Sequence, residues 1–248
     1  MKILFSNLGY ARGIDGSLWH HVSRVGRHFY CTVPPQQLAL SQLKEVMNAE
    51  QPDLCCFVEI DKGAFHSSYF NQMEALRDDS YRFSDITNKY GEGHFLSRLP
   101  FHKSKCNGFL AKHDLLFEKL YFKSGRKRLI YRVALPEGVM VYFAHFSLQG
   151  HVRIQQFNEI GAMINEDGRP SILLADFNIF QGFSEIAELL NIANLKLMNR
   201  DGEHTFRFHK RQHILDLCLA TDNIAGRIDL KIIPQPYSDH AALFLEIK

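Results

Sequence analysis

Polar residues close several apolar runs of the sequence, at points where a β-strand would deliver a side chain to the rim of a sheet. Asn7 ends the run KILFSN, Glu59 ends DLCCFVE, and Asp176 and Asn178 close ILLADFN. Taken alone, Asn7 is also typical of a turn, and Glu59 of a solvated strand end. In an extended chain, however, residues 176 and 178 point to the same side. Because carboxylate and amide oxygens suit a hard cation such as Mg²⁺, this group predicts a divalent-metal site.

A second group surrounds a histidine near the end of the sequence. Ser238-Asp239-His240 precedes the apolar run AALFLEI, and Asp216 lies inside the apolar run ILDLCL. A carboxylate in an apolar strand is costly to bury unless it is paired. Pairing with His240 would meet that need, orient the imidazole and raise its basicity toward a general base for water. His145, which follows the run VMVYFA, is a further candidate, and the alternative for it is an ordinary core histidine.

These candidates need elements that bring them to one place. Short apolar, β-branched or aromatic runs predict strands at residues 2–6, 53–60, 94–98, 129–135, 139–146, 171–177, 214–221, 228–233 and 241–247. Apolar residues three and four apart predict helices at 37–50, 151–166 and 183–193, with a further helix over about 67–78. Consecutive strands without a helix predict antiparallel hairpins in 94–146 and 214–247. The sequence therefore favours a mixed two-sheet core with helices outside.

The order of these residues resembles the endonuclease/exonuclease/phosphatase superfamily, which includes DNase I-like nucleases, apurinic endonucleases, sphingomyelinases and inositol-phosphate phosphatases. The shared features span residues 3–247 and are Asn7, Glu59, Gly93 through Leu96-Ser97-Arg98-Leu99-Pro100, His145 with Arg153 and Gln156, Asp176-Phe177-Asn178, Asp216 and Ser238-Asp239-His240. Asp-x-Asn and Ser-Asp-His are the most specific of them. The resemblance implies an α/β (α+β) fold of the DNase I-like kind, a four-layer sandwich of two packed mixed β-sheets flanked by helices.

The resemblance also implies a Mg²⁺-dependent phosphoesterase, with Mn²⁺ as a possible substitute. In such an enzyme Glu59 binds the catalytic cation, and Asn7 lies at the scissile phosphate or in the metal shell. Asp239 lies near the metal, directly or through water. These three residues are the expected metal site.

Catalytic roles follow from the same resemblance. Asp176 aligns or deprotonates the attacking water, and Asn178 supports the phosphate. His240, held by Asp216, contacts a phosphate oxygen or serves as the base; members of the family differ on which group is the base. His145 matches a histidine that nuclease and sphingomyelinase relatives carry on the leaving side, where apurinic endonucleases carry tyrosine, which argues against the abasic-site branch.

Three functions compete on this sequence. The first is a phosphodiesterase or nuclease, supported by basic residues at 123–128, at Arg24, Arg27 and His28, and at Lys210-Arg211, but weakened by a net charge of only +2. The second is a phosphatase or phosphodiesterase of a small or lipid phosphoester, although no amphipathic surface helix for membrane docking is evident. The third is a non-catalytic binding protein on the same fold, which the complete set of expected residues disfavours.

Composition bounds the remaining expectations. Hydrophobic residues make up 46% and charged residues 23% of the 248 residues, as in ordinary globular proteins, and no composition break or repeat marks a domain boundary. We therefore expect a single domain over residues 1–248, acting as a monomer. No apolar stretch is long enough for a signal-peptide core or a membrane span. With five cysteines that we expect to be reduced, the cytoplasm is the expected location.

Three further segments carry alternatives. The stretch 8–36 shows no clear period and is either a substrate-facing loop or a surface excursion stapled by Trp19 and Phe29. The run 123–128 is a basic hairpin tip that could meet a polyanion or a plain solvated turn. Arg98 could bind phosphate, but local pairing is the better expectation. Arg153 and Gln156, one helical turn apart, are expected to pack the loop below His145.

Overall fold

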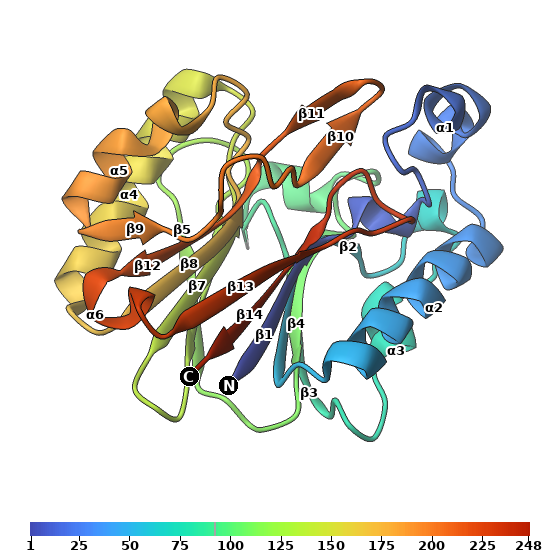
Figure 1. The fold of residues 1–248 in the computed structure, drawn as a ribbon. Coiled ribbons are helices and arrows are strands. Elements are labelled where there is room, and N and C mark those ends of the chain that lie inside the picture. The colour runs from blue at the N-terminus through green and yellow to red at the C-terminus, as the bar shows by residue number, and fades with distance from the viewer. Residues whose placement is uncertain (92) are drawn as a thin grey trace.

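The computed structural model describes residues 1–91 and 93–248 and contains two six-stranded mixed sheets packed face to face (Figure 1). The first sheet has the order β13 (Ile228–Ile233), β14 (Ala242–Ile247), β1 (Lys2–Asn7), β2 (Leu54–Asp61), β4 (Lys105–Ala111) and β3 (Phe83–Asn88). The second has the order β5 (Phe117–Tyr121), β6 (Leu129–Ala134), β7 (Met140–His145), β8 (Ser171–Asp176), β12 (Asp216–Thr221) and β9 (Leu195–Leu197). A separate hairpin pairs β10 (Phe206–Phe208) with β11 (Arg211–His213).

Helices cover both outer faces of the sandwich. The α-helices are α1 (Leu18–Ser23), α2 (Val33–Glu50), α3 (Gln72–Leu76), α4 (Gly150–Asp167), α5 (Ala187–Ile192) and α6 (Asp222–Ala225). Short 3-10 segments are η1 (Gly9–Ala11), η2 (Val25–His28), η3 (Phe65–Ser67), η4 (Phe95–Arg98) and η5 (Phe183–Ile186). Figure 1 shows α2 and α3 on the first sheet and α4 and α5 on the second. This arrangement confirms the expected four-layer DNase I-like sandwich.

Three apolar layers hold the sheets and helices together. In β1, Ile3 and Phe5 point into the layer between the sheets, while Leu4 points to the layer under α2. The third layer lies under α4, where Phe157 and Ile160 pack. Because each central strand is covered on both faces, its sequence is a continuous apolar run rather than an alternating one.

Most predicted elements are present, but residues 94–98 are not a strand. They form η4, whose first turn is capped by His94: the Nδ1 atom accepts a hydrogen bond from the backbone N of Leu96 at 3.2 Å. A local cap of this kind satisfies the backbone within the turn, which a strand would leave for a neighbour. The predicted helix at 67–78 is also shorter, because only Gln72–Leu76 is α-helical within that range.

The stretch 8–36 is more structured than either expectation. It contains η1, α1, η2 and the beginning of α2, which starts at Val33. Trp19 and Phe29, expected as staples, are 74% and 73% exposed and therefore hold nothing in place. All five cysteines are free and buried. Among residues 1–91 and 93–248, no helix has both the length and the apolar character needed to cross a membrane.

Candidate active site

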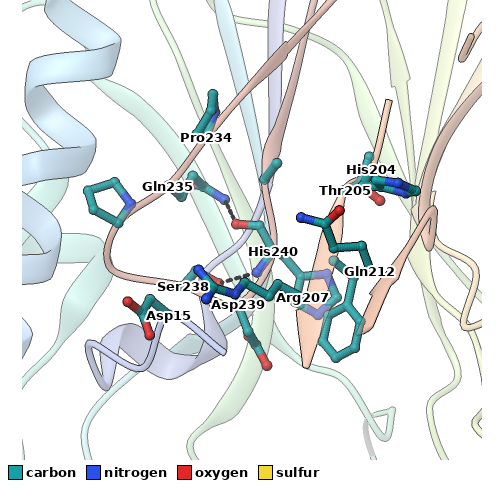
Figure 2. A pocket seen from close by; sticks show the side chains of 13 residues that line it. Asp15, His204, Thr205, Arg207, Gln212, Pro234, Gln235, Ser238, Asp239 and His240 are labelled. Carbon is teal, nitrogen blue, oxygen red and sulfur yellow. Dashed lines mark hydrogen bonds between the residues drawn. The ribbon is translucent and has the colours of Figure 1, made fainter. Parts of the chain in front are cut away.

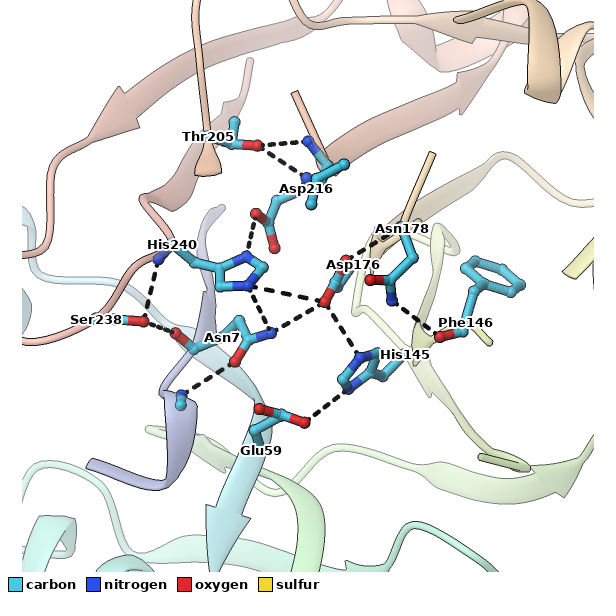
Figure 3. Close-up of polar contacts among 12 residues, drawn as sticks. Asn7, Glu59, His145, Phe146, Asp176, Asn178, Thr205, Asp216, Ser238 and His240 are labelled. Carbon is cyan, nitrogen blue, oxygen red and sulfur yellow. Dashed lines mark hydrogen bonds and ion pairs between the residues drawn. The ribbon is translucent and has the colours of Figure 1, made fainter. Parts of the chain in front are cut away.

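The two sheets deliver polar residues to one edge of the sandwich (Figure 3). In the second sheet, the strand register places Asp176 of β8 opposite His145 of β7 and opposite Asp216 of β12. In the first sheet, Asn7 ends β1 and Glu59 lies in the neighbouring β2. His240 comes just before β14, the other neighbour of β1. Each sheet therefore supplies three side chains that face the three of the other sheet.

Glu59 reaches the site through an irregularity in its strand. The pairing of β2 with β4 shifts register between Phe57 and Ile60, and Glu59 has a φ of 55°. A bulge of this kind re-aims one side chain at a cost in backbone energy that non-glycine residues rarely accept. The strand continues past Glu59 to Asp61, one residue beyond the predicted strand 53–60.

Asp176 and Asn178 do not share the face of an extended strand. β8 ends at Asp176, and Asn178 adopts a φ of 54°. The backbone N of Asn178 donates to Asp176 Oδ1 at 3.1 Å, and its Nδ2 donates to the backbone O of Phe146 at 3.0 Å. The prediction of a common face was wrong because a turn, stabilised by the Asp176 carboxylate, replaces the strand at this point. Asn178 orients Asp176 and fastens it to the segment after β7.

His240 and Asp216 form a buried pair. His240 Nδ1 lies 2.7 Å from Asp216 Oδ2, and Asp216 is fully buried. Thr205 Oγ1 accepts a hydrogen bond from the backbone N of Asp216 at 2.9 Å, which fixes that strand end. Burial alone would lower the pKa of His240, but the Asp216 carboxylate outweighs burial and raises it. Burial also raises the pKa of Asp216 above its ordinary value, in spite of the His240 charge.

His145 lies at 3% exposure between three charged groups. Its Nε2 is 3.2 Å from Asp176 Oδ2 and in contact with the Nζ of Lys127, while its Nδ1 is 3.7 Å from Glu59 Oε1. Burial and the Lys127 charge lower the pKa of His145 to about 4, so the ring is neutral at physiological pH. Its Nδ1 is buried without a hydrogen-bond partner among the described residues. This unpaired nitrogen lies on the Glu59 side of the ring.

Lys127 belongs to the basic run 123–128, but its side chain is not part of a solvated tip. Gln156 Nε2 donates to the backbone O of Lys127 at 2.8 Å and to that of Ser124 at 3.0 Å, so α4 anchors the turn. Burial and the neighbouring Lys89 charge lower the pKa of Lys127 to about 7. Sequence analysis missed this residue because a basic run is typical of an exposed turn.

Lys89 and Tyr10 form a second group around Glu59. Lys89 Nζ donates to Glu59 Oε1 at 3.0 Å and is hydrogen bonded to the Tyr10 hydroxyl, which itself donates to Glu59 Oε1 at 3.2 Å. Burial would raise the pKa of Glu59, but the Lys89 charge and its hydrogen bond, together with the Lys127 charge, hold it well below its ordinary range. Glu59 is therefore a carboxylate at physiological pH. No motif in the sequence marks Lys89 or Tyr10.

Asn7 directs its amide nitrogen into the site. Nδ2 donates to Asp176 Oδ2 at 3.0 Å and lies 3.4 Å from His240 Nε2, while Oδ1 accepts from the backbone N of Gly9 at 3.0 Å. Ser238 Oγ donates to the backbone O of Asn7 at 2.9 Å, which joins β1 to the loop before β14. The donor end of the amide therefore faces the centre, and its oxygen faces the main chain.

Asp239 lies on the first-sheet side of the same edge. Its backbone O accepts from Arg207 N at 2.9 Å, and Gly16 packs so closely that a Cβ there would come within 2.0 Å of Arg207 O. Burial and the nearby Glu59 carboxylate raise the pKa of Asp239, although His240 opposes them. Two carboxylates whose charges disfavour each other are stabilised by a shared cation.

Two sets of residues have the chemistry of a metal site. Ligand atoms of Asp176, Asp216 and His240 lie within 4.8 Å of one another. A cation there would break the 2.7 Å contact between Asp216 and His240, which we regard as the orienting pair of the site. The carboxylates of Glu59 and Asp239 interact electrostatically and offer only oxygen atoms, the ligand type that a hard cation such as Mg²⁺ prefers.

A pocket of about 280 Å³ opens beside His240 (Figure 2). It lies between the segment that leads through the β10–β11 hairpin and the loop 234–241, and its lining includes Phe206, Arg207, Gln212 and Asp239. The Phe206 ring lies 4.8 Å from the His240 ring and covers one side of it. A molecule bound at His240 can extend into this pocket.

The remaining sequence candidates lie outside the centre. Arg98 is exposed in η4. Arg153 donates to the backbone O of Ser147 at 3.0 Å and pairs with Glu185, and Gln156 Oε1 accepts from Ser147 N at 2.9 Å. Both therefore hold the loop after His145, as expected from their spacing.

The fold and the arrangement of this edge define a class of α/β-sandwich proteins. The family model described as "Endonuclease/Exonuclease/phosphatase family" matches residues 30–240, and the chain belongs to that family. A comparison with curated proteins finds no match.

Solved structures with the same fold have low sequence identity. The chain is similar to an endonuclease/exonuclease/phosphatase family protein from Leptotrichia buccalis, with 16% identity, a TM-score of 0.68, and 100% of this chain and 99% of that chain covered. The chain is also similar to the endonuclease domain of the telomere-specific non-LTR retrotransposon TRAS1, with 12% identity, a TM-score of 0.62, and 100% of this chain and 98% of that chain covered. A third similar structure is sphingomyelinase C from Streptomyces griseocarneus, with 15% identity, a TM-score of 0.61, and 100% of this chain and 99% of that chain covered.

Proposed function

We propose that the protein is a divalent-metal-dependent phosphodiesterase that cleaves a P–O bond by in-line attack of an activated water. The observation that carries the proposal is the His240–Asp216 pair at 2.7 Å, which faces Asp176 and Asn7 across the edge where the two sheets meet. In-line attack builds negative charge on the phosphate and leaving oxygens, and preplaced donors and cations stabilise that charge.

Glu59 and Asp239 would hold the cation, preferably Mg²⁺ with Mn²⁺ as a substitute. Bound there, the cation supplies positive charge to the phosphate and to the leaving oxygen. Lys89 fixes the Glu59 carboxylate by a contact of 3.0 Å and keeps it ionised. Asn7, first expected to serve either the metal or the phosphate, takes the phosphate role because it is the amide nitrogen that faces the centre.

The remaining groups act on the water and on the phosphate. Asp176 orients the water and takes its proton, while Asn178 fixes the Asp176 carboxylate from behind. His240, kept protonated by Asp216, donates to a phosphate oxygen. His145, with Lys127 against it, lies on the other side of Asp176 from His240 (Figure 3). There the two residues stabilise the leaving oxygen. These roles are supported by the contacts of each side chain within the site.

Two substrate classes fit this centre. Nucleic acid is the first, supported by Arg207, Lys210 and Arg211 around the β10–β11 hairpin beside the catalytic pocket. Arg24 and Arg27 each donate from Nη1 to a backbone carbonyl, which fixes the side chain but leaves its positive charge in place. A lipid or small phosphodiester is the second candidate, and the exposed apolar surface of α1, described below, favours it.

The test is hydrolysis of a substrate panel with and without Mg²⁺. Bis-(p-nitrophenyl) phosphate reports the chemistry, and plasmid DNA, single-stranded oligonucleotides, RNA, sphingomyelin and inositol phosphates report the substrate. We expect Mg²⁺-dependent release from the diester and from one natural class. If Mg²⁺ and Mn²⁺ neither support any hydrolysis nor change the thermal stability, the protein is a binding protein on this fold and the proposal is wrong.

A further inference from the structure

A short segment between the active-site edge and α2 exposes large apolar side chains in a regular pattern. These side chains lie in or next to α1 and η2 and are between 46% and 74% exposed. They belong to Leu18, Trp19, Val22, Val25, Phe29 and Tyr30. Leu18 and Val22 share one face of α1, and Val25 and Phe29 follow at the start and just after the end of η2. In a globular protein such a stripe normally faces the core, whereas this one, which we name the apolar stripe, faces solvent.

The opposite side of the segment holds it against the protein. His20 Nδ1 lies 2.7 Å from Asp15 Oδ1, and the His21 ring packs edge-on against Phe208 of β10 at 4.9 Å. Arg24 and Arg27 donate to the backbone oxygens of Gly13 and Arg12. The polar side is thus anchored by specific contacts, and the apolar side is presented outward by the fold itself.

Positive charge surrounds the apolar stripe. Residues 8–36 contain three arginines, Arg12, Arg24 and Arg27, but a single acidic residue, Asp15. Arg12 contacts the His28 ring with a separation of 3.4 Å, and the Arg12 charge contributes, after burial, to lowering the pKa of His28. An apolar surface framed by cations complements a bilayer with anionic headgroups, in which the apolar groups enter the interface and the cations meet phosphates.

The composition of the apolar stripe favours a lipid surface over nucleic acid as its binding partner. Leu18, Val22 and Val25 are aliphatic and provide no ring on which a base could stack. Trp19 and Tyr30 are the residue types that membrane–water interfaces favour. No amphipathic surface helix was evident from the sequence, because the apolar period here is short and is interrupted between α1 and η2.

We propose that the apolar stripe docks the protein on the surface of an anionic lipid bilayer. The segment adjoins the catalytic edge: His209 N donates to Gly16 O, and Gly16 packs on Asp239. Figure 1 shows α1 at the periphery, across from the β10–β11 hairpin. A bilayer-bound protein would therefore hold its active site next to the headgroup layer. Docking goes beyond the proposed hydrolysis and does not require it.

The test uses the one tryptophan of the chain, Trp19, as its own reporter. The His240→Ala variant in EDTA is mixed with vesicles of phosphatidylcholine alone or of phosphatidylcholine with phosphatidylglycerol, which adds negative surface charge. We expect co-flotation with the anionic vesicles, a blue shift of tryptophan emission and quenching by brominated acyl chains. Because hydrolysis is blocked and no metal is present, failure of the proposed function leaves this result unchanged.

Substitutions then locate the contact. Val22→Asp and Phe29→Asp each lower the partition coefficient at least ~10-fold, since each loses one buried apolar side chain and gains a repelled charge. Leu116→Asp is the matched control, because Leu116 is 82% exposed and follows β4 at the end of the sandwich opposite Asn7. All variants should melt within a few degrees of the parent.

Three results would overturn the proposal. One is the absence of flotation with anionic vesicles at low ionic strength. The second is flotation that Val22→Asp and Phe29→Asp leave intact. The third is a change of Trp19 emission caused by a single-stranded oligonucleotide or by self-association, with none caused by vesicles, which would assign the apolar stripe to one of those occupants.

Discussion

His240 Nδ1 and Asp216 Oδ2 lie 2.7 Å apart at a point where both side chains are buried, although 24 residues separate them in the chain. The contact leaves His240 Nε2 facing the centre, 3.4 Å from Asn7 Nδ2 and 4.0 Å from Asp176 Oδ2. Asp216 is anchored in turn through its backbone to Thr205. This chain of contacts determines which ring nitrogen meets the substrate.

The first prediction concerns this pair. His240→Ala should lower kcat by about 10³-fold or more, and Asp216→Asn by about 10²-fold, because the ring remains but loses its orientation and charge. Steady-state kinetics with bis-(p-nitrophenyl) phosphate measure both. Thermal melting shows that each variant folds. An Asp216→Asn variant as active as the parent would remove the orienting role from Asp216.

The second prediction concerns Asp176. Asp176→Ala should lower kcat by about 10³-fold or more, because the water loses its acceptor and His145 and Asn7 lose theirs. Asp176→Asn keeps the side-chain volume but replaces one accepting oxygen with an NH₂ group that donates hydrogen bonds. This variant should be comparably inactive. Circular dichroism should report an unchanged fold. Near-normal turnover in either variant would sink the assignment of the catalytic centre.

Most of the buried strands and the edge strand β13 were predictable from the sequence, whereas β3, β4 and β5 were not. Several strands are buried on both faces, so their sequences are recognisable as continuous apolar runs. They are β1, β2, β7, β8, β12 and β14. β3 and β5 are only partly buried and carry polar residues, and β4 contains Gly108, which no propensity favours in a strand. Gly108 is needed because a Cβ there would meet Asp85 O at 2.5 Å. Tertiary contact, not local preference, determines that strand.

The candidate site divides in the same way. Four site residues could be found because each lies inside an apolar run or at one of its ends: Asn7, Asp176, Asp216 and His240. Lys89 and Lys127 could not, since only the folded chain brings them beside Glu59 and His145. The direction of the Asn178 side chain was also unpredictable, because its left-handed backbone reverses the direction that a strand would give that side chain. The assignment of all 248 residues to one domain stays a prediction.

The third prediction concerns the cation. Saturating Mg²⁺ or Mn²⁺ should raise the melting temperature of the parent by about 5–10 °C, as expected for a ligand at ~100 times its dissociation constant. Glu59→Gln should abolish most of that shift because the amide lacks the ligand charge. The control is Glu118→Gln, whose side chain is 60% exposed. A full shift retained in Glu59→Gln would exclude Glu59 as a ligand.

The fourth prediction concerns Lys127. Lys127→Met should lower kcat by roughly 10–100-fold, because the leaving oxygen loses a nearby positive charge, and Lys127→Arg should recover part of it. Lys123→Met, in the same turn but exposed, is the matched control and should leave kcat unchanged. Equal effects of the two methionine variants would mean that the turn acts through its overall charge alone.

The fifth prediction concerns pH and lies far from the active site. Asp167, at the end of α4, accepts from the Tyr142 hydroxyl at 2.8 Å and pairs with Arg132 and Arg169, and its side chain is 3% exposed. Burial would raise the pKa of Asp167, but Arg169, Tyr142 and Arg132 outweigh it and hold the pKa below the ordinary value of 3.8.

A depressed pKa in the folded state stabilises the protein above the unfolded-state pKa, and the contribution is lost as pH falls through the folded value. Asp167→Asn should therefore lower the free energy of unfolding by about 2 kcal/mol at neutral pH, where hydrogen bonds to a buried carboxylate are lost. Urea unfolding between pH 7 and pH 3 measures the difference between parent and variant, which should shrink only below about pH 4. A difference that stays constant to pH 3 would show that Asp167 acts through packing and not through its charge.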